Sequence, residues 1–329
     1  MNNNTQNELW DIIEHSIPYV PDTQREKEEL EDTATQDPDT DPEITEAEEQ
    51  ESKQWSRNAA KKKKEAYRMI NSTAKSVFDN PMNLQDYLLV QANFNRYSVR
   101  NALLIAAQMP SASVLHSYTE WKQGGYSVRQ GVKGVAVLEP GNEYIRRDGS
   151  HGRYMDIRTH LDISQVIGEV PQKEKTYDTV REQRLSKLSA LVYCMNNKIK
   201  IIDTKKDPDI LYGRPAFYNN GIIYADSDRL DFTTLYPVLA TEIAHAHCER
   251  MRSEDYSRQQ YGAICEFAGF MVCKKQDVTW NSALRIPESY RDLSVTEKIM
   301  ILDTTRSIFN GINSDIEKSF RKEQRKHEK

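Results

Sequence analysis

The stretch Thr241-Glu242-Ile243-Ala244-His245 places a carboxylate and an imidazole at a spacing that suits hydrolytic chemistry. A helix with His-Glu-x-x-His presents its two histidines on one face, where they hold zinc, and its glutamate is the general base for the metal-bound water. Glu242 and His245 keep this spacing, but Thr241 stands where the first histidine would be. Because zinc in proteins is held by imidazole, thiolate or carboxylate, the pattern predicts a damaged zinc site.

A third zinc ligand could come from Glu266, which lies 21 residues after His245 on the next expected helix. Three protein ligands and one open position for water are typical of a catalytic zinc site. Three interpretations stay open. The site is degenerate and binds zinc weakly or not at all; or it is active, with His245 and Glu266 on the metal and Glu242 as general base; or these residues form a polar helical stripe with a structural role only.

Two other stretches, "NFNRYSVRN" and "YTEWKQGGYSVRQGVKG", interleave aromatic and cationic side chains. Proteins bind single-stranded nucleic acid through cationic grooves and aromatic rings on which bases stack. The cations are the better candidates, because charged side chains are rarely buried, whereas Tyr97 and Trp121 suit a core equally well. The candidate nucleic-acid-binding residues are Arg96, Tyr97, Arg100, Asn101, Trp121, Lys122, Arg129 and Lys133.

Charge is distributed unevenly along the chain. Residues 1–52 contain 17 acidic and two basic side chains, so their net charge is −15; since the whole chain carries −5, the remainder carries +10. Repeated Asp-Pro and few apolar residues predict a disordered acidic tail over 1–54. A basic body suits contact with nucleic acid, and the tail either competes for the same surface or only confers solubility.

Hydrophobic periodicity predicts an α+β fold in two domains. In the first, over 55–170, helices come before Pro110, and two strands flank the turn "RRDGSHGR". A linker over 171–180 leads to the second domain, over 181–318. It holds a helix over 181–196, a strand "KIKIID", a hairpin around Asn219-Asn220-Gly221, and helices over 231–251, 258–276 and 295–320. A charged tail is expected over 319–329.

The chain is expected to be cytoplasmic. It has no run of 18 apolar residues, no basic and apolar leader at its start, and four scattered cysteines without a C-x-x-C pair, which favours reduced thiols. No contact with a membrane is expected.

Residues 93–140, followed by the segment "LDISQV", resemble the N-terminal single-stranded-DNA-binding domain of the ArdC-type anti-restriction proteins and their LtrC-like relatives. The pattern in that family runs Tyr-Ser-x-x-Asn, an apolar helix ending Gln-x-Pro, a Trp, Gly-x-x-Val-x-x-Gly-x-x-Gly, and a Ser-Gln strand. The matching residues are Tyr97, Ser98, Asn101, Gln108, Pro110, Trp121, Gly125, Val128, Gly131, Gly134, Ser164 and Gln165.

The second half resembles the zincin-like metallopeptidase domain that follows in the same family, with Thr241 through Ala246 at His-Glu-x-x-His-Ala and Cys265-Glu266 at a downstream Ala-Glu. The resemblance covers residues of about 60 to 318. It implies a single-stranded-DNA-binding, anti-restriction-like protein of a plasmid or conjugative element. Its zincin-like domain would be degenerate rather than enzymatic, and could bind a protein partner. The alternatives are an active zinc metallopeptidase and an accessory module of a conjugation primase or relaxase.

Overall fold

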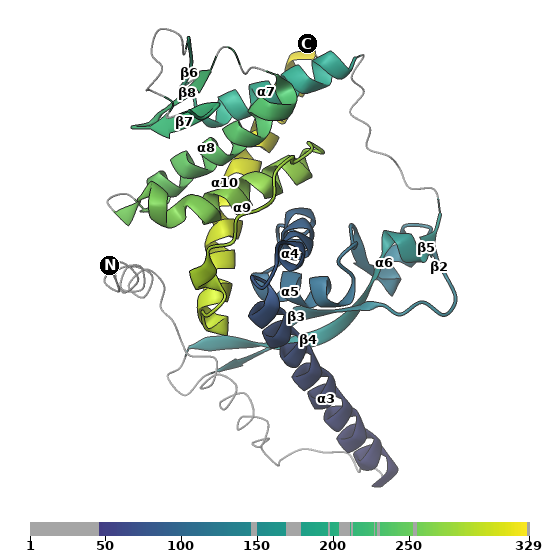
Figure 1. Cartoon of the computed structure of the whole chain (residues 1–329). Helices are drawn as coiled ribbons and strands as arrows, with labels where there is room; N and C mark the ends of the chain where they lie inside the picture. The colour runs from purple at the N-terminus through teal and green to yellow at the C-terminus, as the bar shows by residue number, and fades with distance from the viewer. Residues whose placement is uncertain are drawn as a thin grey trace. The chain divides into compact units, whose positions relative to one another are not determined.

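The computed structural model is shown in Figure 1. It describes residues 46–145, 150–168, 179–196, 198–203, 211, 213–226, 228, 231–252 and 255–327. Most of the predicted acidic tail, and residues 171–178 of the predicted linker, lie outside the described residues. Within the described residues, no helix is long and apolar enough to cross a membrane.

The predicted mixture of helices and strands is confirmed. The first half forms α3 (Glu46–Ser76), α4 (Pro81–Asn93), α5 (Val99–Gln108), β1 (Leu115–Ser117), α6 (Tyr118–Gln123), β2 (Ser127–Val128), β3 (Val135–Ile145), β4 (His151–Asp162), the 3-10 helix η2 (Ile163–Gln165) and β5 (Val166–Ile167). The second half forms α7 (Val180–Cys194), β6 (Ile199–Ile202), β7 (Ala216–Asn219), β8 (Ile222–Asp226), α8 (Phe232–Arg252), α9 (Arg258–Lys275), the 3-10 helix η5 (Glu288–Tyr290) and α10 (Val295–His327). The predicted charged tail is thus helical as far as His327.

The strands of the first half form two small sheets. The first has the order β1-β4-β3, with β1 antiparallel to β4, and the second pairs β2 with β5. At the end of β4, the buried carboxylate of Asp162 accepts hydrogen bonds from the backbone amides of Ser113 (2.7 Å), Val114 (3.1 Å) and Ser164 (2.9 Å). Asp162 therefore joins β4 to the segment that leads into β1.

Asp162 should make the fold sensitive to acid. Burial by itself would raise the pKa of this carboxyl, but the hydrogen bonds from Ser113, Ser164 and Val114 outweigh burial and lower the pKa below its usual value. A depressed pKa stabilises the fold above the unfolded-state pKa of about 3.9, and this contribution is lost as pH falls through the folded pKa. We expect Asp162→Asn to lower the free energy of unfolding at pH 7 by about 1–3 kcal/mol, with the difference from wild type shrinking below about pH 4. Denaturant unfolding of both proteins between pH 7 and about pH 3 checks this prediction. A stability difference between wild type and Asp162→Asn that does not change with pH would contradict it.

The described residues form two compact units, and their division differs from the predicted domains. One unit holds the described residues up to Tyr67 together with Leu138–Arg158; the other holds Arg68–Val137 together with residues from Thr159 onward. The second unit therefore takes helices from both predicted domains. The predicted boundary at 171–180 separates segments of sequence, but the hydrophobic core continues across it.

Contacts between the two sequence halves explain this shared core. The Phe78 ring lies 6.2 Å from the ring of Phe267 in α9 and 5.2 Å from that of Tyr290. The buried Lys298 ammonium in α10 donates a hydrogen bond to the carbonyl of Lys75, at the end of α3 (2.6 Å). In addition, α4 packs against α9 and α5 against α10. Because α4 and α5 bury apolar side chains in this way, they belong to the same core as α8, α9 and α10.

The second half carries a three-stranded sheet of order β6-β8-β7, in which β6 is parallel to β8 and β7 is antiparallel to it. The predicted hairpin is confirmed. Asn220 and Gly221 both have positive φ (47° and 80°), as a two-residue type I′ turn requires. The helix α8 contacts β7 on one side and α9 on the other (Figure 1). This arrangement places the Glu242-to-His245 turn between an edge strand and a second helix.

Candidate functional site

Glu242 in α8 is buried, and both of its carboxylate oxygens are engaged. Oε2 accepts a hydrogen bond from the backbone amide of Tyr218 in β7 (2.7 Å) and pairs with Nη2 of Arg258. Oε1 accepts a second hydrogen bond from Nη1 of Arg258 (3.2 Å). The carboxylate therefore forms a two-pronged ion pair with the first residue of α9, and a hydrogen bond to a strand.

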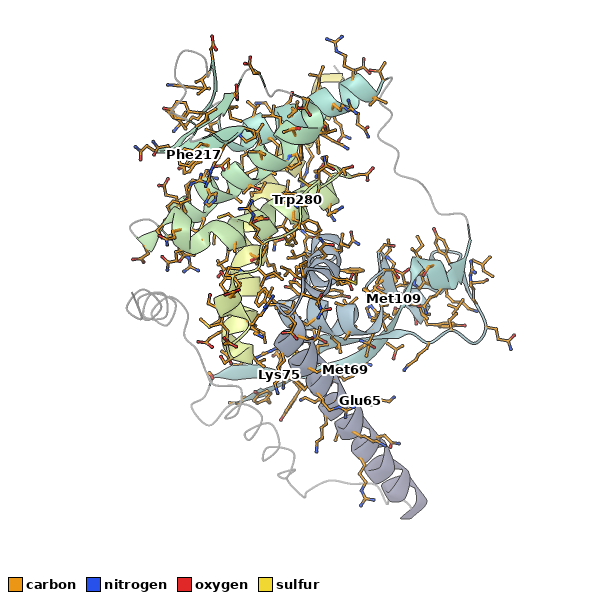
Figure 2. The ribbon with its side chains drawn as sticks, viewed as in Figure 1. Glu65, Met69, Lys75, Met109, Phe217 and Trp280 are labelled. Atoms are coloured by element: carbon orange, nitrogen blue, oxygen red, sulfur yellow. The ribbon has the colours of Figure 1, made fainter. Side chains whose placement is uncertain are left out.

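The guanidinium of Arg258 also contacts the strand. Nη2 donates to the carbonyl oxygen of Tyr218 (3.3 Å), and the guanidinium carbon lies 4.2 Å from the centre of the Phe217 ring. Figure 2 labels Phe217, which belongs to β7. Since β7 is an edge strand, these backbone groups of Tyr218 are the ones directed away from β8.

A second carboxylate of α8 fixes the same hairpin. Glu249 accepts a hydrogen bond from the hydroxyl of Tyr218, and that hydroxyl accepts one from the amide of Gly221 (3.2 Å). Burial, followed by the contact with Glu249, raises the pKa of Tyr218 to about 12. Glu242 and Glu249 lie two helical turns apart, so together they hold the hairpin along one face of α8.

His245 is buried one turn after Glu242. Its Nδ1 atom lies 2.9 Å from the hydroxyl of Tyr256. Burial, followed by the nearby charges of Arg258 and Arg214, lowers the pKa of His245 to about 3. The imidazole is therefore neutral at physiological pH.

The residues at the other ligand positions do not fit a zinc ion. The Thr241 hydroxyl donates to the carbonyl of Pro237 (3.1 Å) within its own helix, and Thr241 packs so closely on Gly269 that a Cβ there would lie 2.6 Å from Oγ1. Burial raises the pKa of Glu266, which lies beside Arg285. In the part of the chain that the structure describes, no three His, Cys, Asp or Glu residues are grouped so as to hold a metal. The predicted convergence of Glu242, His245 and Glu266 is thus not observed there.

Sequence reasoning missed Arg258. It lies 16 residues after Glu242, at the start of a different helix, and belongs to no motif. The available signal was general: a buried carboxylate needs a cation or several hydrogen-bond donors.

Two of the candidate nucleic-acid-binding residues are buried. Trp121 in α6 is 4% exposed, and its Nε1 donates to the carbonyl of Leu161 (2.8 Å). Its ring meets those of His116 and Tyr126 edge-on, at 4.9 and 5.0 Å between centres. Asn101 in α5 is also 4% exposed. Trp121 is therefore a packing group whose indole offers no free face to a base, and Asn101 exposes little of its side chain.

The other candidate nucleic-acid-binding residues differ in their exposure to solvent. The side chains of Arg96, Lys122, Arg129 and Lys133 are exposed, whereas Tyr97 and Arg100 are half-buried. The Tyr97 hydroxyl lies 3.5 Å from Nδ1 of His160 in β4, and its ring lies 5.9 Å from that of Phe94. Tyr97 therefore ties the loop that carries Arg96 to the sheet that leads into α6.

Three of the exposed cations are sequence neighbours of residues in one small hydrophobic cluster. Its members are Trp121, Leu161, Val166, Tyr126, Val128, Val132 and Ile163. Lys122, Arg129 and Lys133 each follow directly after a member of this cluster, so the chain alternates between packed and exposed side chains. Gln165 holds the segment in place: its carbonyl accepts from the Arg129 amide (3.0 Å), and its Nε2 donates to the Lys133 carbonyl (2.8 Å).

An exposed aromatic ring lies in the same region. Tyr118, the first residue of α6, is 54% exposed, and the Lys122 ammonium lies 5.6 Å from the centre of its ring. Among the aromatic residues of "YTEWKQGGYSVRQGVKG", Tyr118 rather than Trp121 thus presents a large apolar surface to solvent.

Other motif residues serve the backbone. The side-chain amide of Gln108 accepts from the amide of Ala136 (2.9 Å) and donates to its carbonyl (3.0 Å). Gly131 has φ of 77°, which favours glycine, and a Cβ at Gly134 would lie 2.7 Å from the carbonyl oxygen of His160. The pattern that carries the resemblance is therefore largely a pattern of folding requirements.

A family model agrees with the resemblance predicted from sequence for the first half of the chain. The family model described as the N-terminal domain of anti-restriction factor ArdC matches residues 40–184. Two similar solved structures are those of the antirestriction protein ArdC from the R388 plasmid. The metal-free structure is 16% identical, with a TM-score of 0.44, and covers 68% of this chain and 86% of that one. The Mn(II)-bound structure is 18% identical, with a TM-score of 0.44, and covers 67% of this chain and 85% of that one.

No curated protein matches the chain. The family match falls on the segment that carries the Tyr-Ser-x-x-Asn, Gln-x-Pro, Trp and Gly-x-x-Gly residues, and the predicted resemblance is confirmed there. Residues 40–184 are therefore similar to the N-terminal domain of the ArdC-type anti-restriction proteins.

Proposed function

We propose that this protein binds single-stranded DNA and protects the DNA of a plasmid or conjugative element from restriction as it enters a cell. The observation that carries the proposal is the set of four exposed cations, Arg96, Lys122, Arg129 and Lys133, within the family-matched segment. Three of them directly follow members of one hydrophobic cluster in the sequence, and the Lys122 ammonium lies 5.6 Å from the centre of the exposed Tyr118 ring. Cations beside an exposed aromatic ring suit the phosphates and bases of a single strand.

The rigidity of this region supports the proposal. Gln165 fixes the backbone at Arg129 and Lys133, and Trp121 fixes the backbone next to Lys122. The cations therefore project from an ordered scaffold, so less conformational entropy of the backbone is lost when phosphates bind.

We also propose that the second half has no peptidase activity and acts as a scaffold or as a surface for a protein partner. A general base needs a free carboxylate oxygen to accept a proton from water. In Glu242 both oxygens are already engaged by Arg258 and the Tyr218 amide. The Thr241 hydroxyl, meanwhile, is turned to its own helix.

Binding to a fluorescein-labelled oligothymidylate, measured by anisotropy, tests the DNA proposal. We expect wild-type protein to bind, and replacement of the four cations by Ala to weaken binding strongly, because phosphate contacts supply most of such affinity. The matched control is the double variant Lys318→Ala/Arg321→Ala, which removes two exposed cations of α10. The proposal fails if wild type does not bind, or if the control loses as much affinity as the fourfold variant.

A further inference from the structure

A cation lies beside Glu242 in this fold. In a zinc site of the His-Glu-x-x-His pattern, the metal ion is the positive charge next to the glutamate. Here the positively charged group beside Glu242 is the guanidinium of Arg258. It pairs with both carboxylate oxygens of Glu242 and also contacts the edge strand β7.

We infer that Arg258 is an internal replacement for both the metal and a bound peptide. Its guanidinium supplies the positive charge that Glu242 needs, and it also occupies the backbone groups of β7 that an extended peptide would use. The inference deepens the proposal that the second half is not a peptidase, because it names the residue that excludes metal and substrate together.

The charge argument rests on the burial of Glu242. Its side chain is 5% exposed, and removing such a carboxylate from water costs several kcal/mol unless a cation and hydrogen-bond donors compensate. A planar guanidinium matches a carboxylate with two parallel hydrogen bonds, which are observed here. Glu242 is thus fully compensated within the protein and needs no metal.

The backbone argument rests on Tyr218. An extended peptide binds an edge strand by pairing with its outward amide and carbonyl. The outward amide of Tyr218 already donates to Glu242, and its carbonyl already accepts from Arg258. The Glu242–Arg258 pair therefore fills the hydrogen-bonding positions of one residue of a substrate strand.

One contact fixes the start of the helix that carries Arg258, and another holds its guanidinium. The helix α9 begins directly at Arg258, capped by Ser257, whose hydroxyl accepts from the Gln260 amide (3.2 Å). The ring of Phe217 forms a cation-π contact with the guanidinium. The arginine is therefore a fixed part of the fold rather than a mobile surface side chain.

The experiment restores the missing histidine with and without the arginine. We expect the double variant Thr241→His/Arg258→Gln to bind zinc about tenfold more tightly than Thr241→His alone, because it removes the cation beside Glu242. Thr241→His/Arg258→Lys keeps a cation there and should bind zinc no more tightly than Thr241→His. The gain in the double variant should be lost on the further change His245→Ala. Zinc affinity is measured by competition with a chromophoric chelator, on protein whose fold is checked by circular dichroism.

A second series uses Thr241→Asp in place of Thr241→His. Because Thr241 packs on Gly269, an imidazole could disturb the helix pair, whereas aspartate is close to threonine in size and is also a zinc ligand. The inference would be overturned if, in both series, a folded double variant bound zinc no more tightly than the single variant that keeps Arg258. DNA binding is read separately by anisotropy, so failure here and failure of the proposed function are distinguishable.

Discussion

Arg258→Ala is expected to lower the free energy of unfolding by about 3–5 kcal/mol, because it leaves the buried carboxylate of Glu242 without a cation. Glu242→Ala should lower the free energy of unfolding by less than Arg258→Ala does. The Arg258 side chain is 23% exposed, so it can turn toward water when its partner is gone, whereas Glu242 is only 5% exposed. The double variant Glu242→Ala/Arg258→Ala should lose clearly less free energy of unfolding than the sum of the two single variants. When Arg258 is already absent, removing Glu242 also removes the uncompensated buried charge.

Chemical denaturation of the four proteins in this cycle gives the coupling between the two side chains. The control is Arg153→Ala, which removes an ion pair to Glu143 whose side chains are both more than half exposed and should change stability by less than about 1 kcal/mol. Additive effects of the Glu242 and Arg258 changes would contradict a structural role for the pair. The inference that Arg258 replaces the metal would then lose its basis.

Trp121→Ala is expected to lower the free energy of unfolding by about 3–5 kcal/mol, as for other buried aromatic side chains. The ring fills the small cluster with Leu161 and Val166, and its indole N–H satisfies the Leu161 carbonyl. Trp121→Phe should lower the free energy of unfolding by less than Trp121→Ala, because phenylalanine keeps part of the ring volume and loses mainly this hydrogen bond.

Tyr118→Ala is the matched control for Trp121, since it removes an exposed ring three residues earlier and should change stability by no more than about 0.5 kcal/mol. Thermal or denaturant unfolding of the three variants checks the prediction. A Trp121→Ala protein that is as stable as wild type but loses DNA binding would contradict the packing role, and would return Trp121 to the stacking role that its sequence context suggests.

Local sequence patterns predicted the helices and the hairpin of the second half well. The Asn-Gly turn between alternating apolar residues predicted the β7–β8 hairpin, because positive φ at both positions is a strictly local requirement. The apolar periodicity and caps likewise predicted α8 and α9 to within one or two residues.

Relations between distant residues were not predictable in this way. Spacing placed Glu242 and His245 on one turn of helix, but gave no sign that Arg258 would pair with Glu242. Similarly, Trp121 and Tyr118 lie within one turn of α6, and the interleaved pattern does not show which of the two faces the core.

The two compact units differ from the predicted domains for the same physical reason. The change in composition near 171–180 indicated a boundary, but the apolar faces of α4 and α5 pack on α9 and α10, which lie more than 150 residues later. Composition reports the segments of a chain, whereas the core depends on which faces those segments bury together.

The most direct test of the central claim is the salt dependence of binding to a single-stranded oligonucleotide. Each phosphate contact contributes about 0.7 to the slope of log K against log salt concentration for single strands. If Arg96, Lys122, Arg129 and Lys133 each contact a phosphate, the fourfold Ala variant should show a slope about three smaller than wild type. The Lys318→Ala/Arg321→Ala control should keep the wild-type slope. Equal slopes for wild type and the fourfold variant would contradict the claim that these cations form the DNA-binding surface.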